Sequence, residues 1–194
     1  MTNIKFNVSV GIPAYNEQEN IGHLLNSILK QKEGNFDLKE IIVISDASND
    51  GTGKIVRSFS DSRITLIENT VRVGQAQNQN KIIQKFSGDI LLFLNADILL
   101  QNNYYIEKMI APFYLNKNLG ITSSRVVPLP AETFFEKIIN FSVQIKEDMI
   151  YRINGGDNIY ACHGRGRAFS GLLARQFEWN LTGAVSEDAY SYLK

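Results

Sequence analysis

This sequence contains almost no cysteine, and its positive and negative charges balance. Cys162 is the only cysteine among 194 residues, so the chain cannot form an internal disulfide, and a reducing compartment such as the cytoplasm fits best. Lysine and arginine together number 20, as do aspartate and glutamate, so the formal net charge is zero. Because nucleic-acid binding driven by bulk charge needs an excess of positive residues, this balance predicts no nucleic-acid partner.

Long apolar runs are also missing. None approaches the ~18 residues that a membrane-spanning helix needs. The N-terminal residues 7–12 are typical of a strand and not of a signal peptide. With 194 residues and 44% hydrophobic content, the chain is long enough for a soluble domain with a full core. We therefore expect a single cytoplasmic domain.

Two glycine-rich phosphate-binding motifs do not occur. The P-loop pattern Gly-x-x-x-x-Gly-Lys-Ser/Thr is absent, and the first expected strand is followed by Pro-Ala-Tyr-Asn-Glu at 13–17 instead of the dinucleotide fingerprint Gly-x-Gly-x-x-Gly. Phosphates are therefore not expected to lie in a glycine loop. Acidic residues at the end of the strands would instead hold a diphosphate through a divalent cation. Mg²⁺ and Mn²⁺ are the candidates, because both prefer oxygen ligands.

Short apolar segments alternate with amphipathic ones through about residue 127. Strands are expected at residues 8–12, 40–44, 64–67, 90–94 and 119–127, with helices between them, including 75–86 and 103–115. Asn16 and Glu19 have the spacing of a capping box for the first helix. The alternation predicts an α/β fold with a mostly parallel, doubly wound sheet flanked by helices.

The last third is less regular. Its apolar residues recur at helical spacing and predict one long amphipathic helix whose stripe faces the core; they are Phe134, Ile138, Phe141, Ile145 and Met149. The polar segment 154–167 contains several glycines and is expected to be a loop. Its arginines Arg165 and Arg167 either meet phosphates or the acceptor or are solvated. Cys162 is expected to serve packing, and Trp179 either lines an acceptor pocket or packs in the core or on the surface.

Polar clusters follow three of the expected strands. They are Tyr15-Asn16-Glu17, Ser45-Asp46 and Asn95-Ala96-Asp97. If the strands are parallel, all three clusters meet in the crevice at the carboxyl ends of the strands, where α/β sheets bind ligands. Taken alone, Asp97 could equally well cap the next helix. Three clusters at one mouth favour a site for a polar ligand or a metal ion.

These same residues carry a resemblance. The ordered segments Pro13 to Glu17, Asp46 to Thr52, Gly88 to Asp97 and the pair Glu187-Asp188 resemble the motifs of family 2 glycosyltransferases. The resemblance implies a Rossmann-like GT-A fold over essentially the whole chain. Residues 1–127 would form the part that binds a nucleotide sugar, and residues 128–194 the acceptor-side part.

The resemblance also implies roles for individual residues. Pro13, Tyr15 and Glu17 would line the pocket for base and ribose, and Asp46 would hydrogen-bond the base, typically uracil. Further contacts to the nucleotide sugar would come from Gly74, Asn80, Asn95 and Ala96.

Metal binding would rest on Asp97. It matches the last Asp of the Asp-x-Asp motif and would hold Mg²⁺ or Mn²⁺. The first Asp of that motif is Asn95 here, which is a neutral oxygen donor.

The implied reaction is inverting transfer of a sugar from a nucleotide-diphosphate donor, typically a UDP-sugar, to an acceptor hydroxyl. Asp188, with Glu187 before it, matches the general base, and a bound cation would stabilise the leaving diphosphate. The acceptor would be a glycan or a lipid-linked molecule, and the helix that contains Phe134 could then dock on the cytoplasmic face of a membrane. Family members usually continue past the Glu-Asp pair, so we expect the acceptor-side part to be incomplete.

Two other functions stay open at this point. A nucleotidyltransferase that activates a sugar phosphate would share the sheet and the acidic metal ligands, although it would need a glycine-rich basic loop directly after the first strand. A nucleotide-sugar or glycan-binding protein without catalysis would be consistent with Asn95 in place of the first acid.

Overall fold

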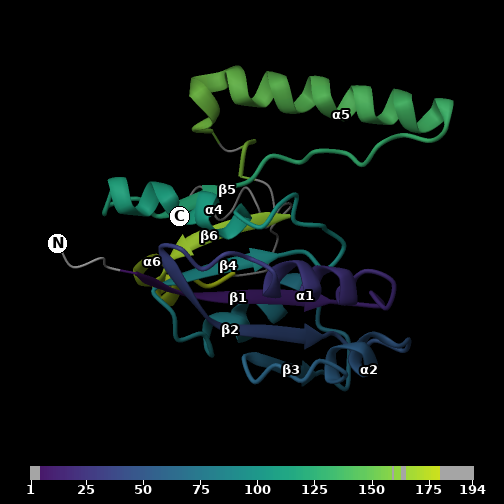
Figure 1. The fold of residues 1–194 in the computed structure, drawn as a ribbon, viewed down its shortest axis with the longest axis vertical. Helices are drawn as coiled ribbons and strands as arrows, with labels where there is room; N and C mark the ends of the chain where they lie inside the picture. Colours follow the sequence, from purple (N-terminus) through teal and green to yellow (C-terminus); the bar gives the residue numbers. More distant parts are fainter. Residues whose placement is uncertain (1–4, 159, 163–164, 180–194) are drawn as a thin grey trace.

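A six-stranded sheet with strand order β3-β2-β1-β4-β6-β5 forms the centre of the molecule (Figure 1). The structure is a computed structural model, and it describes residues 5–158, 160–162 and 165–179. β1 pairs in parallel with β2 and β4, and β2 with β3, whereas β6 is antiparallel to both of its neighbours. The prediction of a mostly parallel α/β sheet is therefore confirmed. The strands are β1 (Phe6–Ala14), β2 (Phe36–Ser45), β3 (Ile64–Glu68), β4 (Ile90–Leu94), β5 (Ile121–Ser123) and β6 (Gly166–Ser170).

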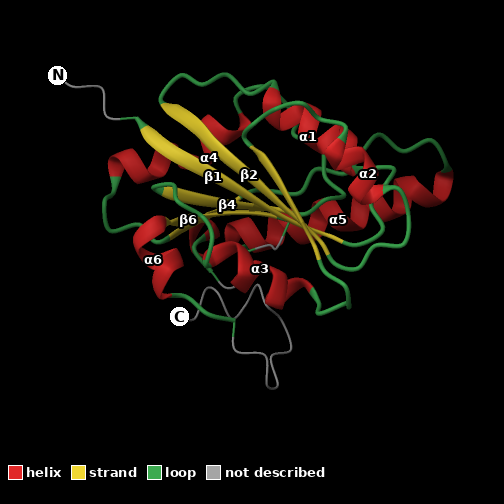
Figure 2. Ribbon diagram, turned by 90° about the horizontal axis from the view of Figure 1, so that it is seen from below, coloured by secondary structure: helices red, strands yellow, loops and turns green. Residues whose placement is uncertain are grey.

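Helices cover both faces of the sheet (Figure 2). α1 (Ile21–Leu29), α2 (Thr52–Arg57) and α4 (Tyr105–Leu115) contribute to the core on one face, and α3 (Gln75–Ile83) and α6 (Gly171–Gln176) to the core on the other. Successive side chains of a strand point to opposite faces. Leu92 of β4 accordingly lies in the first core and Phe93 in the second. This two-sided burial explains why β4 has no polar residue.

The order of the strands reverses between β1 and β4. From β1 the chain moves outward to β2 and β3, and then α3 carries it back across the sheet to β4 on the other side of β1. Such a reversal opens a crevice at the carboxyl ends of the two strands, because the connections leave in opposite directions. The residues that follow β1 and β4 are therefore placed to bind a ligand.

The start of α1 differs from the expectation. Its N-cap is Asn20, whose side chain makes no capping hydrogen bond, so the predicted capping box of Asn16 and Glu19 is wrong. Asn16 instead binds the loop after β2, as described below. Among the helices that the structure describes, a complete capping box stands at Thr133 and Glu136, at the start of another helix.

The segment predicted as a loop at 154–167 ends in a strand. β6 begins at Gly166 and inserts between β4 and β5, and β5 is shorter than the predicted strand at 119–127. α6 follows β6 directly. Five residues carry too little periodicity to distinguish a strand from a loop, and the pairing that defines β6 is with a distant segment.

The long helix α5 (Phe134–Arg152) forms as predicted, but its apolar stripe is not core. Phe134 is 77% exposed and Phe141 64% exposed, and Figure 1 shows α5 lying apart from the sheet along one side of the molecule. α5 contacts chiefly the 3₁₀ turn η1 (Ile153–Gly156) that follows it. The prediction that this stripe faces the core is therefore wrong. Among the described residues, no helix is long and apolar enough to cross a bilayer.

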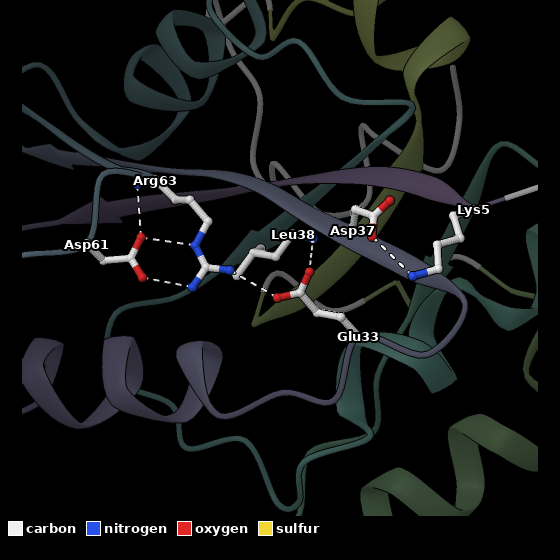
Figure 3. A network of polar contacts seen from close by, with 6 residues as sticks. All are labelled: Lys5, Glu33, Asp37, Leu38, Asp61 and Arg63. Atoms are coloured by element: carbon white, nitrogen blue, oxygen red, sulfur yellow. Dashed lines mark hydrogen bonds and ion pairs between the residues drawn. The ribbon is translucent and has the colours of Figure 1, made fainter.

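Ion pairs on the surface connect the end of α1 with β2 and the approach to β3 (Figure 3). Arg63 donates to Asp61 at 2.8 Å and to Glu33 at 3.0 Å, and Glu33 accepts from the Leu38 N–H at 2.8 Å. The side-chain hydrogen bond from Arg63 lowers the pKa of Asp61 to about 2. These contacts fix the surface around the first two strands, away from the crevice.

Close packing between β1 and α3 generates a test. A Cβ on Gly11 would lie 2.7 Å from the Ile82 Cγ2 and 3.1 Å from the Phe93 ring. We expect Gly11→Ala to lower the free energy of unfolding by about 1–3 kcal/mol, as overpacking of a core does. Urea unfolding measures the change. In an Ile82→Ala background the same replacement should cost less, because the nearest methyl group is gone; equal costs in both backgrounds would contradict this explanation.

Candidate functional site

A cavity of about 310 Å³ lies at the carboxyl ends of β1, β2 and β4. Each of the three polar clusters predicted to converge contributes to its wall, so that expectation is confirmed. The lining residues are Pro13, Ala14, Tyr15, Glu17, Asp46, Arg72, Gly74, Gln75, Asn78, Asn95, Ala96 and Asp97.

Strand pairing brings these clusters together. Ala14 at the end of β1 pairs with Ser45 at the end of β2, and the Asp46 N–H donates to the Ala14 carbonyl at 2.8 Å. β4 runs parallel on the other side of β1, so Asn95 emerges at the same edge. The Asn95 N–H donates to the carbonyl of Arg165 at 3.1 Å, which adds the start of β6 to this edge.

Asp46 anchors the part of the cavity wall that lies just before α3. It is only 3% exposed, and its carboxylate accepts hydrogen bonds from the Val73 N–H at 2.9 Å, the Gly74 N–H at 2.8 Å and the Asn69 amide at 2.8 Å. Burial by itself raises the pKa of Asp46, but the hydrogen bonds from Val73, Asn69 and Gly74 outweigh burial and hold the pKa below its usual value. Asp46 is therefore a buried anion that anchors the segment before α3.

Gly74 is the N-cap of α3 and has a φ of +89°. Residues other than glycine rarely adopt this conformation. It directs the Gly74 N–H at Asp46 and turns the chain into α3 at the cavity wall. Gly74 thus lines the cavity, and its backbone conformation explains why glycine is needed there.

The loops after β1 and β2 hold one another through short polar side chains. The Glu17 N–H donates to the Thr52 Oγ1 at 2.8 Å, and the Gln18 N–H to Asp50 at 3.1 Å. Asp50 also accepts from the Thr52 N–H at 2.9 Å, which is the Asx-type turn expected here. Asn16 joins the two loops in the same way, since its side chain accepts from the Asn49 N–H at 3.0 Å.

Two residues of these loops have left-handed backbone conformations. The φ angle is 55° for Asn16 and 57° for Ala47, which directly follows Asp46. Such conformations are uncommon for residues other than glycine, and they concentrate at binding and catalytic sites. Their position next to the cavity agrees with a functional role for this edge of the sheet.

Arg72 is a cavity residue that the sequence did not reveal. Its guanidinium carbon lies 3.8 Å from the centre of the Tyr15 ring, a cation–π distance, and both side chains line the cavity. Gln75 and Asn78 of α3 were also missed. Arg72 stands two positions before Gly74, so its nearness to a predicted site residue was the one available signal.

Asp97 is exposed at the cavity and, within the described part of the chain, makes no hydrogen bond or ion pair. The Asn95 Oδ1 lies in the same wall and accepts a long hydrogen bond from Gln75 at 3.4 Å. In the residues that the structure describes, no three His, Cys, Asp or Glu side chains could hold a metal together. One carboxylate with a neutral oxygen nearby nevertheless fits Mg²⁺ or Mn²⁺, which are often bound through one or two carboxylates plus substrate phosphates.

Asn80 does not line the cavity. Its amide accepts from the Trp179 N–H at 2.9 Å and donates to the Trp179 carbonyl at 3.1 Å, so both of its polar atoms secure the chain after α6. The structure thus gives Asn80 a packing role in place of the expected contact to a nucleotide. Trp179 itself is buried in the core, which favours packing over a place in an acceptor pocket.

Four other residues were singled out in the sequence. Arg167 is fully buried in β6, with its guanidinium carbon 5.8 Å from the ring centres of Phe169 and Trp179, so it is neither solvated nor at the cavity. Cys162 is buried, in agreement with a packing role. The predicted base Asp188 and its neighbour Glu187 lie outside the described residues.

A second cavity of about 300 Å³ adjoins the first and shares Asp97 with it. Arg165, His23 and Asn20 supply polar side chains on one part of its wall. The extended segment between β5 and α5 supplies mostly apolar ones. The remaining lining residues are Ile98, Leu99, Tyr105, Ser124, Arg125, Val126, Val127, Pro128 and Leu129.

Comparison with known proteins identifies relatives of this chain. The sequence model described as Glycosyl transferase family 2 matches residues 9–173. The Escherichia coli UDP-Glc:alpha-D-GlcNAc-diphosphoundecaprenol beta-1,3-glucosyltransferase WfgD is 32% identical over 134 residues, which cover 62% of this chain and 51% of that protein. The glycosyltransferase AglE of Haloferax volcanii is 41% identical over 93 residues, covering 46% of this chain and 30% of AglE. The chain thus spans about half the length, or less, of these curated relatives.

Solved structures show the same fold. The mannosyltransferase PcManGT from Pyrobaculum calidifontis, in complex with GDP-Man and Mn²⁺, matches with a TM-score of 0.69 at 24% identity. The match covers 96% of this chain and 51% of that protein. At this level of identity the likeness establishes the fold alone, and it confirms the expected GT-A class.

The anchoring role of Asp46 is testable by pH. We expect Asp46→Asn to lower the free energy of unfolding by about 1–3 kcal/mol at pH 7, since buried donors lose a charged acceptor. The folded-state pKa of Asp46 is lowered. Its stabilisation is therefore fully present above the unfolded pKa of ~3.9 and is lost as the pH falls through the lower folded pKa.

Urea unfolding of wild type and variant across a pH series measures this effect. The difference in unfolding free energy should stay constant above about pH 5 and shrink below about pH 4. Asp37→Asn, which removes one partner of an exposed ion pair with Lys5, is the control and should cost less than about 0.5 kcal/mol. A difference for Asp46→Asn that does not change with pH would contradict the proposed anchor.

Proposed function

The chain belongs to glycosyltransferase family 2, and on that premise we propose that it transfers a sugar from a nucleotide-diphosphate donor to an acceptor hydroxyl with inversion at the anomeric carbon. The observation that carries the proposal is the first cavity, where the ends of three strands place Tyr15, Asp46 and Asp97 in one wall. Residues 13–97 supply that whole wall, in keeping with a donor-binding part within residues 1–127.

The donor nucleotide occupies the first cavity in this proposal. Tyr15, with Pro13 and Glu17 beside it, offers an aromatic face for the base and polar groups for the ribose. Asp46 accepts three hydrogen bonds from its own chain, so at most one of the roughly four acceptor positions of a carboxylate is left for a base N–H. A pyrimidine such as uracil, which offers a single N–H, suits that capacity. Thymine would suit it equally, and between the two we propose uracil and a UDP-sugar, as the family resemblance implies.

Arg72 and Asp97 stand on the wall of this cavity with opposite charges. In our proposal Arg72 meets the diphosphate, because a guanidinium forms strong hydrogen bonds with anionic oxygens. The ribose hydroxyls are an alternative set of acceptors for the same N–H groups. Asp97 holds Mg²⁺ or Mn²⁺, with Asn95 and Ala96 beside it. A bound cation supplies Lewis-acid stabilisation of the charge that develops on the leaving diphosphate. Gly74 keeps the wall in place through its bond to Asp46.

The acceptor occupies the second cavity, which shares Asp97 with the first. Its hydroxyl oxygen attacks the anomeric carbon as the bond from that carbon to the diphosphate breaks. We assign removal of the hydroxyl proton to Asp188, assisted by Glu187, which a positioned base can make about 10²–10⁴ times faster. Pro128, Leu129 and Arg165 of the proposed acceptor-side part line this cavity together with residues 124–127 and other residues of the preceding part, so the acceptor would contact both parts.

The alternatives are less well supported. A nucleotidyltransferase would need a glycine-rich basic loop after β1, and β1 is followed by Tyr15-Asn16-Glu17. A binding protein without catalysis is consistent with Asn95, and the experiments below separate it from an enzyme. We propose a cytoplasmic enzyme that works on a glycan or lipid-linked acceptor at the cytoplasmic face of a membrane.

Thermal denaturation with a panel of UDP-, GDP- and dTDP-sugars, with and without Mn²⁺, tests the donor site. At a ligand concentration about 100-fold above Kd with the cation present, one nucleotide class should raise Tm by about 5–10 °C, and the rise should be smaller without the cation. Asp97→Ala should abolish the effect of the cation and retain a smaller effect of the nucleotide. No shift with any donor, or equal shifts with and without cation, would count against the proposal.

Asp188→Asn tests the catalytic base. The variant should bind the donor as wild type does, because Asp188 acts on the acceptor, and its transfer rate should fall about 10²–10⁴-fold. Product formation under single-turnover conditions measures the rate, and the donor-induced rise in Tm measures binding. An unchanged rate would remove Asp188 from the mechanism. Absence of transfer in the wild type with every donor and acceptor tried would favour the binding protein.

A further inference from the structure

The second cavity contains a cation that no described part of the chain neutralises. Arg165 lines this cavity and is exposed. Within the described residues, its side chain makes no hydrogen bond and no ion pair. A guanidinium keeps its proton at every pH at which proteins work. Arg165 therefore brings a permanent positive charge into the space that we assign to the acceptor.

The backbone of Arg165 is held at the edge of the sheet. Its carbonyl accepts from the Asn95 N–H at 3.1 Å, directly after β4, and the next residue, Gly166, begins β6. The Gly166 carbonyl accepts in turn from the Ser124 N–H at 3.0 Å, directly after β5. Three strand ends thus meet at this point. The guanidinium of Arg165 therefore extends from a fixed position beside the end of β4.

Two hydroxyl groups lie against the same backbone. A Cβ on Gly166 would lie 2.7 Å from the Ser124 Oγ and closer still to the Tyr105 hydroxyl oxygen, so both hydroxyls are next to the residue that follows Arg165. Ser124, Tyr105 and the imidazole of His23 all line the second cavity. Each of these groups can donate a hydrogen bond. A phosphate, with three acceptor oxygens, can use more such donors than a carboxylate can.

The other charges on the wall of this cavity are already engaged. Arg125 pairs with Asp148 at 2.6 Å and lies over the Tyr151 ring. Asp97 is the only carboxylate among the described residues that line the cavity, and in the proposed function it holds the metal ion. Arg165 and that metal ion then leave the cavity with an excess of positive charge. Such a cavity favours a ligand that carries negative charge.

We propose that the acceptor is a sugar that carries a phosphate group, and that Arg165 binds this phosphate while the acceptor hydroxyl lies near Asp97. The inference deepens the proposed function, on which it rests for the place of the acceptor in the second cavity. A guanidinium binds phosphate through two parallel hydrogen bonds. Because the backbone of Arg165 lies beside Asn95, two residues before Asp97, the phosphate is close to the reacting hydroxyl. We therefore place it on the accepting sugar itself, as in a sugar 1-phosphate.

A sugar 1-phosphate can be free or esterified to an apolar alcohol, and the phosphate is the same in both. Val127 and Leu129 are 63% and 69% exposed and line the second cavity, so an apolar alcohol would find a matching surface there. The phenyl phosphodiester of the sugar separates the two sources. If it binds more tightly than the free sugar 1-phosphate, and Val127→Ser/Leu129→Ser removes the difference, the acceptor is an ester. Equal binding assigns a free sugar phosphate.

Calorimetric titration tests the phosphate site on the 194-residue protein. The first cavity is saturated with the nucleoside diphosphate and cation that the donor panel identifies. Hexoses, N-acetylhexosamines and their 1-phosphates are then titrated in. At least one sugar 1-phosphate should bind at least about tenfold more tightly than its parent sugar. Arg165→Gln should weaken its binding about 10–100-fold, and Arg165→Lys should weaken it less, because lysine keeps the charge and loses the paired hydrogen bonds.

Transfer kinetics give a second readout. In wild type, kcat/KM should be higher for the sugar 1-phosphate than for the methyl glycoside of the same sugar. Arg165→Gln should move the ratio of these two values toward one, mainly through KM for the phosphate. Arg152→Gln is the matched control, since Arg152 is an exposed arginine at the end of α5 that has no ion pair within the described residues. It should leave the ratio within about twofold of wild type.

Three results would overturn this inference. The first is that no sugar 1-phosphate binds more tightly than its parent sugar. The second is equal affinity for the sugar phosphate in wild type and in Arg165→Gln. The third is loss of the donor-induced rise in Tm in Arg165→Gln, which would assign Arg165 to the diphosphate of the donor. In all three cases wild type still shows the donor-induced rise in Tm. Its absence in wild type would instead count against the proposed function.

Discussion

The hydrogen bonds of one buried carboxylate hold the candidate site together. Asp46 leaves β2 at the edge of the sheet and accepts from two backbone N–H groups and one side-chain amide of the segment before α3. That segment carries Arg72 and has no regular structure of its own. This segment forms part of the cavity wall. Its position is therefore set by the Asp46 side chain, and the position of Asp46 is set by the pairing of β2 with β1. Through Asp46, the rigid sheet thus holds the loop before α3 in a defined position.

The sequence predicts most of this site because parallel strands leave little freedom. Once β1, β2 and β4 are taken as parallel, the residues after them must share one edge, and Tyr15, Asp46 and Asp97 all line one cavity. The periodicity of α5 also predicts a helix correctly. It does not say what covers the apolar face, because periodicity describes one element and burial depends on the neighbours of that element.

Residues known only by their position in a motif were harder to place. Asn80 belongs to a helix that does border the cavity, yet its side chain points to Trp179, 99 residues further along the chain. Arg72 belongs to no motif and reaches the cavity because Asp46 fixes the backbone beside it. In both cases the deciding contact joins distant segments, and a single sequence carries no record of such pairs. Short β6 was missed for the same reason.

The place of β6 between β4 and β5 has a consequence for biosynthesis. β4 is five apolar residues long, and the strand that covers its free edge is made about seventy residues later. At about 5–20 residues per second, roughly 4–14 s of translation separate the two strands. During that interval the emerging chain presents a wholly apolar, unpaired edge, the kind of surface on which strands of other chains can add. Ribosome speed and chaperone access between residues 94 and 166 thus bear on the yield of folded protein.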